Sequence, residues 1–213
     1  MILSSLGQDG LVANTLKYLD GQHVIGLNPD PKRWDGVPLP FGVADLAGIV
    51  AEEIRGRRPV KSVTMAKATL NTGTELYAVN DLFIGPRSHI SAPICFVGRR
   101  QGGAPILERH HRLDGPRLYR LAEKHLCGLA RDDRSLTTTA MEGAAEGAFA
   151  WDAAHLHYVV REPFPSRTTG ASLVIGRINR DHPMTIVSEM PEHGVIFSDG
   201  LEADFSNSTV ARR

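Results

Sequence analysis

The segment of residues 1–31 constrains the possible folds of this chain more than any other part of its sequence. It reads MILSSLGQDGLVANTLKYLDGQHVIGLNPDP: an apolar run, a glycine turn, Val12, Leu16 and Leu19 at helical spacing, and a second apolar run. The helix is expected to end near Gly21, because glycine is favoured just past a helix C-terminus. Strand, helix and strand of these lengths predict a βαβ unit with parallel strands and a right-handed crossover.

The glycine turn, residues 7–10, follows the first of these predicted strands. Open α/β sheets bind ligands beyond the carboxyl ends of their strands, so this position favours a ligand site. The alternative is an ordinary surface turn, since Asp-Gly pairs also form simple connections.

A second amphipathic helix is predicted in GVADLAGIVAEEIRGRR, residues 42–58, and Gly56 is expected to end it. Two strands and two helices cover a parallel sheet poorly. We therefore expect the α/β module of residues 1–57 to be partial or to lean on its neighbour. The apolar face of this helix comprises Val43, Leu46, Ile49, Val50 and Ile54.

After Pro59 the sequence changes to short β-branched and aromatic runs separated by glycine, asparagine and proline, which predicts successive antiparallel strands. Ser198-Asp199-Gly200 lies between two such runs and predicts a hairpin. Residues 58–213 are therefore expected to form a β-rich domain. The segment of residues 109–147 is atypical: it is rich in arginine and histidine, no part of it alternates like a strand, and LYRLAEKHLCGLA in it could be a helix.

Lysine and arginine number 24, as do aspartate and glutamate, so no overall field attracts nucleic acid or an anionic membrane. Cys95 and Cys127 belong to no CxxC motif, which disfavours a zinc ribbon or a disulfide framework and suits a reducing cytoplasm. No apolar run approaches the roughly 20 residues of a membrane-spanning helix. We expect a cytoplasmic protein with no nucleic-acid or membrane partner, in which a local site holds any anionic ligand.

Three motifs, in this order and spacing, resemble those of the NAD kinases. GQDG at residues 7–10 corresponds to the Gly-Gly-Asp-Gly turn of that family, GLN at residues 26–28 to its Gly-x-Asn strand, and ND at residues 80–81 to its Asn-Glu or Asn-Asp pair. The resemblance covers about residues 3–100 and, more loosely, residues 149–205. It implies a NAD kinase-like fold, in which a partial Rossmann-like α/β module is followed by a β-sandwich domain.

The resemblance also implies an activity: ATP-dependent phosphorylation of the 2′-hydroxyl of the adenosine ribose of NAD, giving NADP, with a divalent cation such as Mg²⁺. Asp9 would be the catalytic residue, taking the proton of that hydroxyl or orienting it for attack on the γ-phosphate. The N–H groups after Gly10, at a helix start, would face phosphate. The nucleotide-binding residues that the resemblance implies are Gly7, Gly10, Asn14, Asn28, Asn80 and Asp81.

Two of these assignments have structural alternatives. Asn80 and Asp81 would hydrogen-bond the ribose or the nicotinamide end of NAD, but an Asn-Asp pair also ends a strand in a turn. Asn28 would frame the nucleotide cleft, or it would cap its strand and organise the Asn-Pro turn that follows.

Two departures from the family pattern support a second hypothesis, a degenerate or truncated relative that binds nucleotide without catalysis. Gln8 replaces a glycine of the turn, which puts a side chain where backbone would approach phosphate. The Thr-Gly-Ser-Thr-Ala-Tyr type segment of the family has no clear equivalent, and its expected place is the atypical segment, residues 109–147. Local divergence and a translated frameshift both account for that segment.

The histidines predict no metal site of their own. His155 and His157 would share one face of a strand, which zinc can use, but no acidic residue or cysteine stands at ligand spacing around them. Family members usually associate through the β-rich domain, so the resemblance implies a homo-oligomer.

Overall fold

The computed structural model describes residues 1–34, 36, 38–87, 94–99, 105–110, 116–119, 150–160, 167, 175–190 and 194–207. The N-terminal part contains a three-stranded sheet with strand order β1-β2-β3. All its pairs are parallel, with Ile2 opposite His23 and Leu27 opposite Phe41. The parallel strands of the βαβ unit are thus confirmed, and the third strand was not predicted. In chain order the elements are β1 (Ile2–Leu6), α1 (Asp9–Leu16), β2 (His23–Asn28), β3 (Phe41–Gly42), the 3₁₀ helix η1 (Val43–Asp45) and α2 (Leu46–Ile54).

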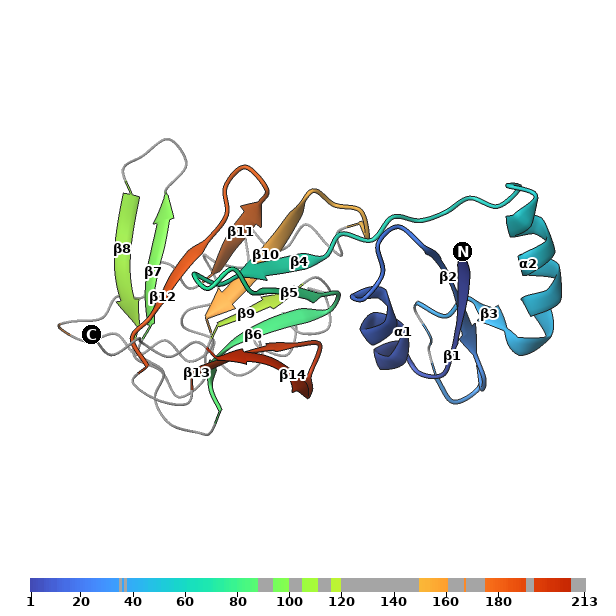
Figure 1. Ribbon diagram of the computed structural model, residues 1–213, viewed down its shortest axis with the longest axis horizontal. Coiled ribbons are helices and arrows are strands. Elements are labelled where there is room, and N and C mark those ends of the chain that lie inside the picture. The colour runs from blue at the N-terminus through green and yellow to red at the C-terminus, as the bar shows by residue number, and fades with distance from the viewer. Residues whose placement is uncertain are drawn as a thin grey trace.

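The two helices flank this sheet on opposite sides, and α1 lies on the side of the β-rich part (Figure 1). Ile49 of α2 packs on Ile25 and Leu27 of β2, with partly buried residues around them. The predicted apolar face of α2 is only partly correct, because Val43 and Ile54 are 51% and 73% exposed. α2 ends as expected: Gly56, just beyond it, has a φ of +63°, which glycine adopts without a steric penalty.

The rest of the described chain is β-structure in antiparallel pairs, as predicted. A six-stranded sheet has the order β11-β10-β9-β6-β13-β14, beside a three-stranded sheet β12-β7-β8 and a two-stranded sheet β4-β5. The strands are β4 (Ala66–Thr69), β5 (Glu75–Ala78), β6 (Asp81–Pro86), β7 (Ile94–Arg99), β8 (Pro105–His110), β9 (Pro116–Tyr119), β10 (His155–Val160), β11 (Ile175–Asn179), β12 (Thr185–Ser188), β13 (Gly194–Ser198) and β14 (Leu201–Asn207).

The atypical segment contains strands, although no part of its sequence alternates like one. The last two residues of β8 fall inside it, and β9 lies in the interior of the six-stranded sheet, between β6 and β10. A helix covering LYRLAEKHLCGLA is contradicted at its start, because Leu118 and Tyr119 belong to β9. Residues 120–130 of that stretch lie outside the described residues.

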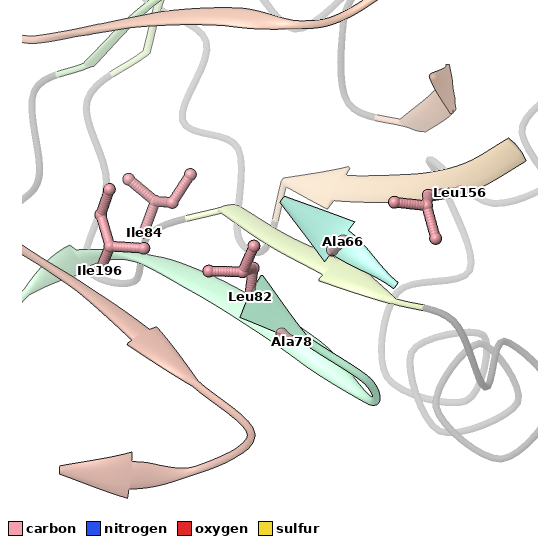
Figure 2. Packing of buried hydrophobic residues seen from close by; sticks show 6 residues of the cluster. All are labelled: Ala66, Ala78, Leu82, Ile84, Leu156 and Ile196. Carbon is pink, nitrogen blue, oxygen red and sulfur yellow. The ribbon is translucent and has the colours of Figure 1, made fainter. Parts of the chain in front are cut away.

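The main hydrophobic core joins the β4–β5 hairpin to one face of the six-stranded sheet. Figure 2 shows its six buried side chains, which come from both layers. The two layers lie against each other where β5 turns into β6, so this core holds both strands that flank the predicted Asn80-Asp81 pair. The six residues are Ala66, Ala78, Leu82, Ile84, Leu156 and Ile196.

Among the helices described, none is long and apolar enough to cross a lipid bilayer.

Candidate functional site

The glycine turn lies at the carboxyl end of β1, where the βαβ pattern placed it. The Gly7 N–H donates a hydrogen bond to the Leu27 carbonyl at 3.3 Å, which ties the turn to the neighbouring end of β2. Asn28, the last residue of β2, therefore lies at the same edge of the sheet. The structure brings together two of the three motifs that the sequence singled out, although they are separated by α1.

At the start of α1, backbone N–H groups have no hydrogen-bond acceptor within the helix. Gln8 is the N-cap residue, and its carbonyl accepts from Leu11 and Val12 at 2.9 and 3.4 Å, but its side chain makes no cap hydrogen bond. The sequence placed the phosphate-facing N–H groups after Gly10, and this is wrong, because α1 begins at Asp9 and the N–H groups of Leu11 and Val12 already donate to Gln8. The N–H groups at Asp9 and Gly10 have no intrahelical partner, because the first turn of any helix lacks one. Such a helix start favours phosphate.

The four residues of the turn differ in exposure. Asp9 is half-buried as the first residue of α1, whereas Gln8 and Gly10 are exposed. A Cβ added at Gly10 would meet no described atom within 4 Å, so packing does not demand a glycine at this position. The turn is therefore open on the side of Gly10.

Asn14 lies on the second turn of α1, away from the first uncapped N–H groups. Its Oδ1 is buried and has no hydrogen-bond partner within the described part of the chain, and the same holds for Ser5 Oγ of β1. Buried polar atoms normally find a partner, protein or water. The predicted donation from Asn14 to phosphate stays a prediction.

Asn28 organises the loop that follows it, which was the structural alternative for this residue. Its Oδ1 accepts from the Asp30 N–H at 3.0 Å, and its Nδ2 donates to the Trp34 carbonyl at 3.0 Å. The side chain is 4% exposed. A role in framing a nucleotide cleft stays a prediction.

The same loop explains why residue 26 is a glycine. A Cβ at this position would lie 2.3 Å from the Pro38 carbonyl oxygen, a backbone atom that cannot easily move away. The lack of a side chain at Gly26 therefore lets Pro38 and Leu39 pack closely against β2.

Asn80 lies in the turn from β5 into β6 and Asp81 is the first residue of β6, and Asp199 holds the backbone here. One carboxylate oxygen of Asp199 accepts from the N–H groups of Asn80 and Asp81 at 2.6 and 3.2 Å, and both oxygens accept from Val79. The Asp199 N–H donates to the Asp81 carbonyl at 2.9 Å. Hydrogen bonds to an ionised carboxylate are among the stronger ones in proteins.

Sequence reasoning missed the role of Asp199, although it correctly predicted the hairpin that contains this residue. Asp199 has a φ of +53°, which is uncommon outside glycine. The Ser-Asp-Gly signal indicated the turn, but nothing in it indicated a contact with residues about 120 positions earlier.

Lys17 is the second residue that sequence reasoning missed. It follows α1 directly, is 7% exposed, and donates to the carbonyl and hydroxyl oxygens of Ser198 at 3.5 and 3.3 Å. The helix was expected to continue to about Gly21, but α1 ends at Leu16. A buried lysine is rare unless it is paired, so this contact marks a fixed junction between α1 and β13.

A histidine pair lies on the opposite face of β10 from the core residue Leu156. The rings of His155 and His157 are 5.2 Å apart, so the two residues share a face as predicted. Arg177 Nε donates to His157 Nε2 at 3.0 Å. Burial lowers the pKa of His157 to about 4, helped by the neighbouring His155 and Arg177 charges.

This lowered pKa predicts a pH dependence of stability. The imidazole is neutral in the folded chain, whereas an unfolded histidine titrates near 6.5. The stabilisation is complete above about pH 6.5 and is lost as the pH falls toward 4, by about 3 kcal/mol at most. We expect His157→Gln to lose less stability than the unmodified protein between these pH values, measured by urea denaturation.

The exposed His182 supplies the matched control. His182→Gln should keep the pH dependence of the unmodified protein. If the free energy of unfolding changed equally with pH in all three proteins, His157 would not be a buried neutral imidazole.

No group of three or more histidine, cysteine, aspartate or glutamate side chains able to hold a metal ion occurs among the residues that the structure describes.

Comparison with solved structures finds a similar fold in a protein of known structure. The chain is similar to the crystal structure of yeast NADH kinase complexed with NADH, with a TM-score of 0.60 and 14% sequence identity. The similarity covers 97% of this chain and 56% of that one, so this chain spans little more than half the length of the yeast enzyme. No protein-family model matches the chain, and no curated protein does. The likeness therefore shows a NAD(H) kinase-like fold, which the motif order had predicted.

Proposed function

We propose that the chain is a NAD kinase-like phosphotransferase, which transfers the γ-phosphoryl group of ATP to the 2′-hydroxyl of the adenosine ribose of NAD or NADH. The observation that carries this proposal is the position of Asp9. It is a half-buried carboxylate that opens α1 at the carboxyl end of β1, in a fold shared with yeast NADH kinase.

Asp9 acts as the base in this proposal. Its carboxylate accepts the proton of the ribose hydroxyl as the hydroxyl oxygen attacks the γ-phosphorus, and ADP leaves with the electrons of the broken P–O bond. Transfer of this kind needs mainly positioning and neutralisation of charge. The uncapped N–H groups at Asp9 and Gly10 favour the phosphates, with the positive end of the α1 dipole behind them.

The turn of Asn80 and Asp81 binds the NAD end of the site in this proposal. Asp199 fixes the backbone of the turn, so the amide and carboxylate side chains start from a rigid base. An amide and a carboxylate together donate to and accept from a diol or a carboxamide. Rigid placement reduces the entropy that binding would otherwise cost.

The divalent cation enters with ATP. Mg²⁺ is usually held by one or two carboxylates together with substrate phosphates rather than by an all-protein cage. Asp9, a half-buried carboxylate at the start of α1, is a single carboxylate of the kind that this pattern uses. When bound, the cation neutralises charge that develops on the phosphate oxygens.

The test is an assay of purified protein with ATP, Mg²⁺ and either NAD or NADH, in which the product is detected by a dehydrogenase specific for NADP or NADPH. Formation of NADP or NADPH supports the proposal and its acceptor. Thermal-shift titrations with NAD and with ATP, each alone, test binding separately, because a ligand stabilises only a folded state that binds it.

A non-catalytic nucleotide-binding protein is the second candidate, and the exposed Gln8 in the turn favours it. A side chain at this position keeps phosphate farther from the backbone than glycine would. Stabilisation by NAD or ATP without product would favour this candidate. The absence of both product and stabilisation would overturn the kinase proposal and this one.

A further inference from the structure

Lys17 links the N-terminal α/β part to the six-stranded sheet through a buried contact. Its side chain leaves the end of α1 and reaches Ser198 at the end of β13, where Nζ donates to the carbonyl at 3.5 Å and to the hydroxyl at 3.3 Å. Lys17 is 7% exposed and Ser198 is 0% exposed. In Figure 1, α1 is the helix that faces the β-rich part.

The partner of Lys17 is itself fixed in place. The Ser198 hydroxyl donates to the Tyr77 carbonyl of β5. Ser198 also pairs with Leu82 of β6 in the sheet. The ammonium therefore meets an acceptor held by two strands, and leaving that acceptor unpaired in a buried setting costs free energy.

The contact lies one residue from the carboxylate that holds the Asn80-Asp81 turn. Asp199 follows Ser198 directly and accepts from the N–H groups of residues 79–81. At the other end, α1 runs from Asp9 to Leu16, and Lys17 is its C-cap. An eight-residue helix is a rigid rod of about 12 Å. Lys17 thus connects, through rigid elements, the candidate base to the candidate NAD-binding turn.

We propose that Lys17 is a positioning residue that sets the placement of Asp9 relative to Asn80 and Asp81. This inference rests on the proposed function for its effect on catalysis, but the placement itself is a property of the fold. Small displacements matter for phosphoryl transfer, since a misplacement of about 1 Å can lower a rate by about 100-fold.

The first test uses kinetics of Lys17→Met, which keeps an apolar stem and removes the ammonium. We expect kcat for NADP formation to fall about 10- to 100-fold. The shifts in thermal unfolding midpoint caused by NAD alone and by ATP alone should stay close to those of the unmodified protein. Lys17→Arg should restore kcat to within about 3-fold, because a guanidinium also carries several N–H donors and keeps the positive charge. Lys61→Met, at an exposed lysine, is the matched control and should keep full activity.

The second test measures placement directly and needs no enzymatic activity. Spin labels at Ile54→Cys of α2 and Thr72→Cys of the β4–β5 turn, both exposed, report the distance between the two parts once Cys95 and Cys127 are replaced by serine. Lys17→Met should broaden or shift the distance distribution, and Lys17→Arg should restore it.

The outcomes separate this inference from the proposed function. An unchanged distance distribution in Lys17→Met would overturn the inference, whether or not the protein makes NADP. An altered distribution in a protein that makes no NADP would support the placement role and count against the kinase proposal alone. An altered distribution with unchanged kcat would overturn the positioning role in catalysis.

Discussion

Asp9→Asn should reduce NADP formation by about 100- to 10,000-fold while leaving the fold intact. A positioned general base contributes about that factor, and asparagine cannot accept the hydroxyl proton. The change is nearly isosteric. It removes one negative charge from the first turn of α1, which costs only about 0.3–1 kcal/mol of stability. The rate is measured at saturating NAD and ATP, so that the loss appears in kcat rather than in KM.

Asp20→Asn is the matched control, because Asp20 is exposed and lies shortly after α1. It should keep the full rate. If Asp9→Asn retained more than a tenth of the activity, Asp9 would not be the base, even if the protein were a kinase. Unchanged binding of NAD and ATP to Asp9→Asn would place the defect in the chemical step.

The parts of the fold that the sequence predicts well are those in which local pattern and local structure agree. The apolar runs around α1 predicted parallel strands, Gly56 ended α2, and the Ser-Asp-Gly signal marked the β13–β14 hairpin. Each of these depends on neighbours in the chain. Helix ends and tight turns are determined by backbone preferences that a few residues carry.

The parts that the sequence does not predict depend on contacts between distant segments. β9 has only four residues, PRLY, and its strand conformation comes from pairing with β6 on one side and β10 on the other. The two-residue β3 likewise exists only through its pairing with β2. Such short segments carry no periodicity of their own, so tertiary pairing decides their conformation.

The candidate site shows the same division. The sequence placed Asn28 and the Asn80-Asp81 pair at the ends of strands, and the structure has them there. It placed Asp9 in the turn before a helix, whereas α1 already begins at Asp9. Asp199 and Lys17 were missed because an aspartate in a turn and a lysine at a helix end are usually solvated. Only the folded chain brings the Asp199 carboxylate to residues 79–81 and the Lys17 ammonium to Ser198.

Asp199→Ala should cause the largest loss of stability among the variants considered, about 3–5 kcal/mol. Three backbone N–H groups, at residues 79–81, lose a charged acceptor, and two of them donate at 3.0 Å or less. Alanine is also strained at the φ of +53° that Asp199 adopts. The total stability of a domain is about 5–15 kcal/mol, so this single change leaves a marginal fold.

Asp199→Asn keeps this prediction testable if the alanine variant does not fold. Asparagine tolerates a positive φ and retains one carbonyl oxygen as an acceptor. The Asp199→Asn variant should therefore lose only about 1–2 kcal/mol of the free energy of unfolding. Its looser Asn80-Asp81 turn should weaken NAD binding about 10-fold and leave ATP binding unchanged, as measured by calorimetry. Asp181→Ala, at an exposed aspartate beyond β11, should change neither stability nor affinity. If Asp199→Asn matched Asp181→Ala in both measurements, the hydrogen bonds from residues 79–81 to the Asp199 carboxylate would not be what holds the turn.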